Sequence, residues 1–278
     1  MPRFAAIKVL LQVTQHHKNL TDALGAFRDH PKQSLIAELC FGVCRQYYAL
    51  KAILDGLCNK AFKAKDKDIE LALLLGLYQL KFMNIKPFAA VDETVKVAHK
   101  LRKQWAKSVI NATLRRFIRE QETIETQLKT NIEYQTAHPA WLLRSLEQQN
   151  VNYQPWILNN NQQAPLYLRL DLSKVSRDRY LKELQNLGIE ASLSHHLKTA
   201  ICLHSKVNIP DLPGFEQGWF YVQDLAAQFC SELLDLQDEQ RILDACCAPG
   251  GKLAGVLLSG HKFNKVIALD NQENRLTR

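Results

Sequence analysis

The sequence predicts a chain of several domains, in which an all-α bundle precedes a small α+β segment and the beginning of an α/β domain. Three observations support this. Apolar residues recur at helical spacing up to about residue 135, short strand-like segments follow, and two apolar runs flank a glycine-containing turn near the C-terminal end. A length of 278 residues favours two or three domains. We place them at residues 1–135, 136–218 and 219–278.

The N-terminal domain is predicted to contain about six helices. Thr21 and Asp22 are expected to cap an early helix, because their side chains can accept hydrogen bonds from its free N–H groups. Ile69–Met83 is so apolar that we expect a buried helix. Two further helices are predicted near Ala89–Leu101 and Lys107–Arg119.

The net charge of +8 is concentrated in the first half of the chain. Residues 1–150 contain 23 Lys and Arg against 14 Asp and Glu, whereas the remainder contains 13 against 14. A polyanion such as RNA is the partner that this asymmetry favours, although a solvated basic surface would give the same count. The candidate RNA-binding residues lie in the last two helices of the bundle: Lys100, Arg102, Lys103, Lys107, Arg115 and Arg116.

Several classes of protein are disfavoured. No apolar run reaches the roughly 18 residues of a membrane span, and the N-terminus lacks the features of a secretory signal. We therefore expect a cytoplasmic protein without a membrane partner. Seven irregularly spaced cysteines indicate reduced thiols. Cys40 and Cys44 would share a helix face, but with no second pair we predict no metal site. The oligomeric state is left open.

The middle of the chain is predicted to fold as a small α+β unit. Leu166–Leu170, Ile189–Leu193 and Ala200–His204 are typical of strands. Val175–Leu187 is predicted to be a helix that ends at Gly188.

A glycine-containing turn near the C-terminal end indicates a cofactor site. Arg241–Ala245 is predicted to be a central parallel strand, Leu253–Leu258 opens a helix, and Lys265–Asp270 is the next strand. Glycines in such a turn let the backbone approach a ligand, and an acid after the second strand can bind ribose hydroxyls. The turn matches neither a P-loop nor a dinucleotide fingerprint, which leaves S-adenosylmethionine.

Two segments of the sequence resemble those of a known enzyme family. "ILDACCAPGGK" is similar to the first motif of the RNA cytosine-5 methyltransferases, and "WFYVQDLAAQ" to the segment upstream of it. Val91–Glu93 together with "VINATLRR" at 109–116 resembles a NusB-like RNA-binding domain. The whole chain thus resembles the small-subunit rRNA cytosine-5 methyltransferases that carry a NusB-like domain, with a Rossmann-like catalytic domain beginning at about residue 219.

The resemblance implies methylation of cytosine carbon 5 in small-subunit (16S) rRNA, with S-adenosylmethionine as cofactor. Asp244 is expected to orient the turn, to lie near the methionine end of the cofactor, or simply to cap the turn. Gln223–Asp224 belongs to the upstream segment that resembles the family, and it could also be an ordinary helix start. The residues that the resemblance assigns to the cofactor are Cys246, Cys247, Ala248, Pro249, Gly250, Gly251, Lys252 and Asp270.

The chain also departs from the family pattern. The family usually continues the motif as Lys-Thr-Thr, whereas this chain has Leu253, Ala254 and Gly255, and Gly255 weakens a helix by about 1 kcal/mol relative to Ala. The family's nucleophilic cysteines, in Pro-Cys and Thr-Cys motifs, are expected beyond Arg278, so no catalytic residue is assigned and neither Cys246 nor Cys247 is taken as the nucleophile. We interpret the chain as truncated and inactive, with residues 219–278 poorly stable alone. The alternative is a non-catalytic RNA-binding, ribosome-assembly or antitermination factor that uses the basic bundle.

Overall fold

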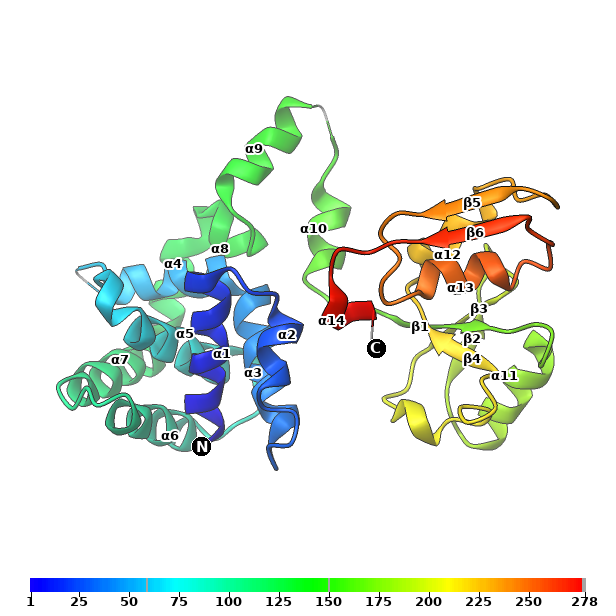
Figure 1. Ribbon diagram of the computed structural model, residues 1–278. Helices are drawn as coiled ribbons and strands as arrows, with labels where there is room; N and C mark the ends of the chain where they lie inside the picture. Colours follow the sequence, from blue (N-terminus) through cyan, green and yellow to red (C-terminus); the bar gives the residue numbers. More distant parts are fainter. Residues whose placement is uncertain (59, 150, 277–278) are drawn as a thin grey trace. The chain divides into compact units, whose positions relative to one another are not determined.

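The computed structural model describes residues 1–58, 60–149 and 151–276, and it divides into two compact units, residues 1–162 and 163–278 (Figure 1). Arg278, beyond which we expected the nucleophilic cysteines, lies outside the described residues. Within the described ranges, no helix is both long enough and apolar enough to cross a membrane.

The first unit is entirely helical, which confirms the predicted class. Asn19 caps α2 by accepting a hydrogen bond from the backbone N–H of Thr21, so the predicted cap at Thr21–Asp22 was wrong by two residues. More than six helices form, because α2 and α8 span only 6 and 5 residues and are too short for a periodic signal. The helices are α1 Pro2–His16, α2 Leu20–Gly25, α3 Gln33–Arg45, α4 Tyr47–Leu57, α5 Lys67–Phe82, α6 Pro87–Lys100, α7 Ala106–Gln127, α8 Ile132–Thr136, α9 Ala140–Gln148 and α10 Gln154–Asn160, with short 3-10 turns at Ala64–Asp66 and Leu128–Thr130.

Helix α5 lies at the centre of the bundle, as its apolar sequence predicted. Its residues 69–79 are all buried, and it packs against α1, α3, α4, α6 and α7. A buried polar chain fixes three of these helices. Arg3 Nε donates to Gln79 Oε1 (3.0 Å), and Gln79 Nε2 donates to Thr94 Oγ1 (3.2 Å). Since unpaired buried polar groups are costly, this chain favours a single register of α1, α5 and α6.

The second unit contains two sheets, which confirms the predicted α+β segment and the parallel strand pair after it. A four-stranded antiparallel sheet has the order β2-β3-β1-β4, and β5 pairs with β6 in parallel. The elements are β1 Leu166–Leu170, α11 Arg177–Asn186, β2 Ala191–Leu193, β3 Ala200–Leu203, β4 Phe220–Val222, α12 Leu225–Glu232, β5 Arg241–Asp244, α13 Gly251–Leu257, β6 Lys265–Ala268 and α14 Glu273–Leu276, with a 3-10 turn at Ile209–Asp211.

Strand β1 links the two parts of the second unit. Leu168 and Leu170 are buried on one face of the sheet, in a core that includes Tyr180 and Leu184 of α11. Because side chains alternate along a strand, Arg169 points to the opposite face, where its guanidinium contacts α12. Strand β4 pairs with β1 and ends directly before Gln223, which places this glutamine on the same side.

Candidate functional site

The turn after β5 is held in shape by its own backbone and by Asp244. The carboxylate of Asp244 accepts a hydrogen bond from Cys246 N (3.1 Å), and Gly250 N donates to Cys247 O (2.6 Å). The Ala248–Pro249 peptide bond is cis. Gly250 has a φ of 100°, a conformation that side chains disfavour, and a Cβ at this position would meet no heavy atom within 4 Å. The turn therefore presents an open backbone face at Gly250.

Asp270, two residues after β6, binds the same turn. Its Oδ2 accepts from Ala248 N (3.0 Å) and its Oδ1 from Gln272 N (2.9 Å). These hydrogen bonds lower the pKa of Asp270, so the carboxylate is ionised at neutral pH. A carboxylate has about four acceptor positions. The backbone N–H groups around Asp270 do not use all of them, which leaves capacity for a hydroxyl group of a ligand.

The two cysteines of the turn have different environments. Cys246 is exposed, whereas Cys247 is buried and its backbone N–H donates to Leu269 O (3.0 Å). Burial, together with the negative charges of Asp244 and Asp270, raises the pKa of Cys247. Its thiol is therefore protonated at neutral pH, and a thiol is a poor nucleophile.

Gln223 and Tyr221 hold the turn from the side of β4. Gln223 Nε2 donates to Gly251 O (3.0 Å), and the Tyr221 hydroxyl donates to the same oxygen (3.4 Å). Gln223 is buried. Its neighbour Asp224 accepts from Ala226 N (2.9 Å) and caps α12. Of the two interpretations left open for this dipeptide, Asp224 thus starts a helix, while Gln223 contacts the turn.

Arg169 was not anticipated from the sequence, although a charged residue inside the apolar strand "LYLRL" could have signalled it. It is only 4% exposed, and it donates to Gln223 Oε1 (3.4 Å), Gln228 O (3.2 Å) and Ser231 Oγ (2.7 Å). No carboxylate pairs with it within the described ranges. A Cβ on Gly255 would lie 2.4 Å from Arg169 Nη1. Gly255, which we expected only to weaken the helix, therefore makes room for this guanidinium.

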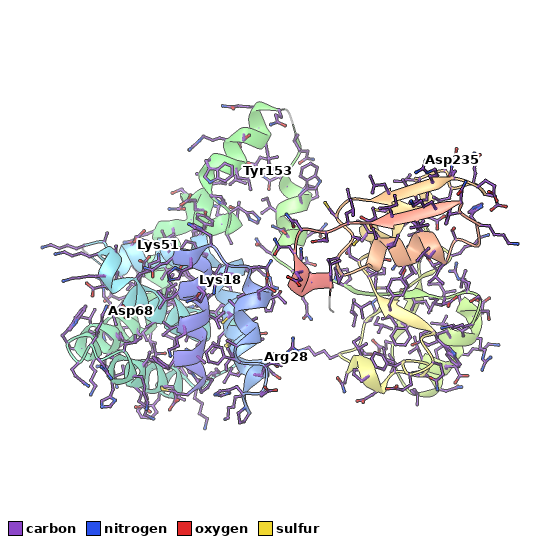
Figure 2. The ribbon with its side chains drawn as sticks, viewed as in Figure 1. Lys18, Arg28, Lys51, Asp68, Tyr153 and Asp235 are labelled. Atoms are coloured by element: carbon purple, nitrogen blue, oxygen red, sulfur yellow. The ribbon has the colours of Figure 1, made fainter. Side chains whose placement is uncertain are left out.

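The predicted RNA-binding residues fall into two groups. Lys100, Arg102 and Lys107 are exposed and form no ion pair within the described part of the chain. Lys103 instead donates to Asp66 (3.0 Å) and to Asp68 (2.7 Å), which is labelled in Figure 2. Burial opposes the charge of Lys103, but the hydrogen bonds to both aspartates raise its pKa. Lys103 therefore has a structural role in the bundle.

The two predicted arginines of α7 also have protein partners. Arg115 is exposed and its Nε donates to Asn111 Oδ1 (2.9 Å). Arg116 is half-buried, and it donates to Glu120 Oε2 (2.8 Å) and to Leu57 O (3.1 Å). Arg115 therefore keeps most of its donors for a ligand, whereas Arg116 is partly engaged within the bundle.

A cavity of about 490 Å³ in the helical unit brings Lys100 and Lys107 together. Lys96 and His99, which the RNA-binding set did not include, line it too, as does Met1. Hydrogen bonds to Asp92 (2.7 Å) and Glu93 (2.8 Å) raise the pKa of Lys96 to about 12. Lys100 and Lys107 are thus the cations of this cavity that have no ion-pair partner among the described residues.

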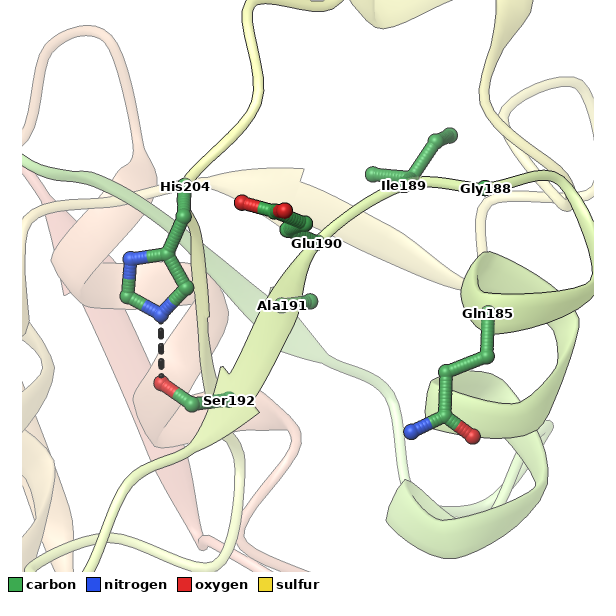
Figure 3. A pocket seen from close by; sticks show the side chains of 7 residues that line it. All are labelled: Gln185, Gly188, Ile189, Glu190, Ala191, Ser192 and His204. Carbon is green, nitrogen blue, oxygen red and sulfur yellow. Dashed lines mark hydrogen bonds between the residues drawn. The ribbon is translucent and has the colours of Figure 1, made fainter.

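A second cavity, of about 510 Å³, lies between α11 and the edge strand β2 (Figure 3). Ser192 Oγ and His204 Nε2 are 2.8 Å apart, as in a nucleophile and its base. However, no third group in the described chain forms a hydrogen bond to the imidazole, and both residues are exposed. The pair therefore lacks the orienting group of a catalytic triad. Groups of three or more potential metal ligands do not occur among the described residues.

Three segments of the chain match known families in order. Residues 1–119 match the NusB family, residues 138–210 match the ferredoxin-like domain of RsmF/B-like methyltransferases, and residues 231–278 match the 16S rRNA methyltransferase RsmB/F family. The crystal structure of PH0851 is similar in fold, with a TM-score of 0.71 at 15% identity, over 100% of this chain and 65% of that one.

Curated relatives agree with these matches. The ribosomal RNA small subunit methyltransferase B of Pseudomonas syringae pv. tomato is 39% identical over 100% of this chain and 63% of its own length. That of Vibrio cholerae is 38% identical over 99% and 64%. The probable enzyme of Coxiella burnetii is 39% identical over 96% and 62%. The chain thus spans somewhat less than two thirds of these relatives.

The helical bundle, the ferredoxin-like sheet and the strand-turn-helix-strand unit follow one another in the order of the three matched domains, which is the domain order of a multidomain methyltransferase family. The chain contains a NusB domain followed by segments of the RsmB/F methyltransferase domains. The family resemblance expected from "ILDACCAPGGK" and from the N-terminal helices is confirmed.

Proposed function

We propose that the protein transfers the methyl group of S-adenosylmethionine to carbon 5 of a cytosine in small-subunit rRNA. Residues 246–252 and Asp270 bind the cofactor in this proposal. The observation that supports it most is the turn after β5, which combines an open backbone face at Gly250 with an ionised carboxylate. Relatives that are named rRNA small subunit methyltransferases add support for the substrate class.

The residues present fit an adenosyl ligand. The open side of Gly250 admits a ligand to the backbone, and the unused acceptor positions of Asp270 can receive ribose hydroxyls. When bound, S-adenosylmethionine supplies an electrophilic methyl group. Gln223 and Tyr221 hold the carbonyl of Gly251 and so keep the turn in a shape that leaves its face open. Cys247 keeps its proton and takes no part in the chemistry.

A matched pair of glycine variants tests the cofactor site. Gly250 and Gly260 both have positive φ values, 100° and 88°, and both face open space, so alanine strains the backbone equally at either position. Calorimetric titration with S-adenosylmethionine should show Gly250→Ala weakening affinity about tenfold or more, equivalent to roughly 1.4 kcal/mol. Gly260→Ala should lose similar stability but keep the affinity. Equal affinity in both variants would exclude the turn as the binding site.

A non-catalytic RNA-binding factor is the second candidate function. The observation that favours it is the cavity with Lys100 and Lys107, which lies in the helical unit and needs no cofactor. The same titrations separate the two candidates. A wild-type chain that binds single-stranded RNA but shows no heat of binding with S-adenosylmethionine would favour the RNA-binding factor over the methyltransferase.

A further inference from the structure

A third cavity in the helical unit belongs neither to the cofactor turn nor to the cavity at Lys100. It has a volume of about 360 Å³ and lies where α3 and α4 meet the α8–α9 connection and the end of α10. This volume is in the range of pockets that enclose small ligands, and it can accommodate one nucleotide. The lining residues used below are Phe41, Arg45, Tyr48, His138, Asn160 and Asn161.

One wall of this cavity is aromatic and cationic. Phe41 is 43% exposed, although it is a large apolar residue. The ring of Tyr48 contacts the ring of Tyr47 edge-on. The Tyr48 hydroxyl makes no hydrogen bond within the described chain. The guanidinium of Arg45 forms no hydrogen bond or ion pair with the described residues. Phe41 is exposed and Tyr48 is partly buried. Accessible aromatic rings are groups on which nucleobases stack, and a guanidinium without an ion-pair partner is a group to which a phosphate binds.

Another part of the lining carries two oriented amides. His138 is 9% exposed and its Nδ1 is 2.6 Å from Thr136 O. Because a carbonyl can only accept, Nδ1 carries the proton, and Nε2 accepts from Asn160 Nδ2 (2.7 Å). Asn161 Nδ2 donates to Thr136 O (2.7 Å). These bonds fix both amides, and each keeps an oxygen and one N–H without a partner in the described chain. Such a pair can bind the mixed donors and acceptors of a base edge.

We propose that this cavity binds one unstacked base of single-stranded RNA. The base stacks on the rings of Phe41 and Tyr48, its edge faces Asn160 and Asn161, and the adjoining phosphate lies near Arg45. The identity of the ligand as RNA rests on the proposed function. The location of the site does not depend on the proposed function, because the cavity shares no lining residue with the cofactor turn or with the cavity at Lys100.

Fluorescence anisotropy with a labelled single-stranded RNA tests this site in the full chain. Phe41→Leu removes the ring face but keeps an apolar side chain, and it should weaken binding roughly 5- to 100-fold. Phe88→Leu is the control, since Phe88 is 74% exposed on α6 away from the cavity. An abasic strand of equal length should bind wild type and Phe41→Leu equally, because it offers nothing to stack.

The charge contact has its own matched pair. Arg45→Gln should weaken RNA binding and reduce the slope of log affinity against log salt concentration by about 0.7, the value for one phosphate contact of a single strand. Arg28→Gln changes the same charge at an exposed position of the same unit (Figure 2) and should leave the slope unchanged.

The outcomes separate this inference from the proposed function. If wild type binds RNA but Phe41→Leu and Arg45→Gln behave like Phe88→Leu and Arg28→Gln, the cavity is not the base site, while RNA remains the partner. If wild type binds no single-stranded RNA, both proposals about RNA are wrong. The proposed site is supported if Phe41→Leu and Arg45→Gln weaken RNA binding and their controls do not. Phe41→Leu must also leave binding of the abasic strand unchanged.

Discussion

Replacing Gly255 by alanine tests whether the buried guanidinium of Arg169 determines the packing of α13. Alanine is favoured over glycine inside a helix by about 1 kcal/mol, so without tertiary contacts the substitution should stabilise the second unit. The new Cβ would, however, lie 2.4 Å from Arg169 Nη1 and 2.7 Å from its Cζ. The guanidinium must move, and it is buried among Gln223, Gln228 and Ser231.

The expected magnitude follows from the hydrogen bonds that such a movement breaks. Hydrogen bonds to charged groups contribute about 1.5–3 kcal/mol each. Loss of two of the three, set against the helix-propensity gain, gives a net destabilisation of about 2–5 kcal/mol. In an Arg169→Met background the obstruction is gone. There, Gly255→Ala should be neutral or should stabilise the unit by up to about 1 kcal/mol.

Urea unfolding measures this double-mutant cycle. Trp219 lies in the second unit, so its fluorescence reports that unit once Trp105, Trp141 and Trp156 are replaced by phenylalanine. The reversal of sign between the two backgrounds is the diagnostic result. Gly255→Ala that stabilises the unit in both backgrounds would refute the inference that Arg169 imposes this glycine.

Two further predictions concern charged residues. Lys103→Gln should lower the free energy of unfolding of the helical unit by about 1 kcal/mol, because Asp66 and Asp68 lose their partner. Lys100→Gln should weaken RNA binding and leave thermal stability unchanged. Identical stability of the two variants would contradict this prediction. The hydrogen bonds of Asp270 lower its pKa on folding. Its ionisation therefore stabilises the fold at pH values above the pKa of the unfolded state, which is near 4. This contribution disappears as the pH falls through the pKa of the folded state. Acid titrations should therefore show the stability difference between wild type and Asp270→Asn shrinking below about pH 4; a difference independent of pH would contradict it.

Local patterns in the sequence were sufficient for the elements around the turn. Leu166–Leu170 was predicted with its correct bounds, and the parallel pair β5–β6 follows from two apolar runs that flank a glycine turn. The same patterns could not show that Lys103 and Lys100 differ. Both are lysines near the end of α6, but only Lys103 meets carboxylates that lie 35 and 37 residues earlier in the chain. Partners at such separations leave no periodic signal in one sequence.

The packing role of Gly255 was missed for the same reason. Helix propensity alone makes it a defect, because propensity describes an isolated helix and contains nothing about what packs on it. The guanidinium that fills the space above Gly255 comes from residue 169, 86 positions earlier. The cap of α2 shows the limit at short range as well, since Asn19, Thr21 and Asp22 are all suitable N-cap types and only geometry selects Asn19. The boundaries assigned to the three domains, and the cofactor and RNA-binding residues, remain predictions.

The hydrogen bonds of Arg169 connect the antiparallel sheet of the second unit with the segment that follows β4. Arg169 belongs to the central strand of the ferredoxin-like sheet, and it donates to Gln223, whose amide in turn donates to Gly251 in the turn. The shape of the turn thus depends on a residue outside the strand-turn-helix-strand unit that contains it. Separated from β1, residues 219–278 would leave the acceptors on Gln223, Gln228 and Ser231 without their donor. We therefore expect poor stability of that segment alone, all the more because Leu243 of β5 is already 61% exposed with β1 in place.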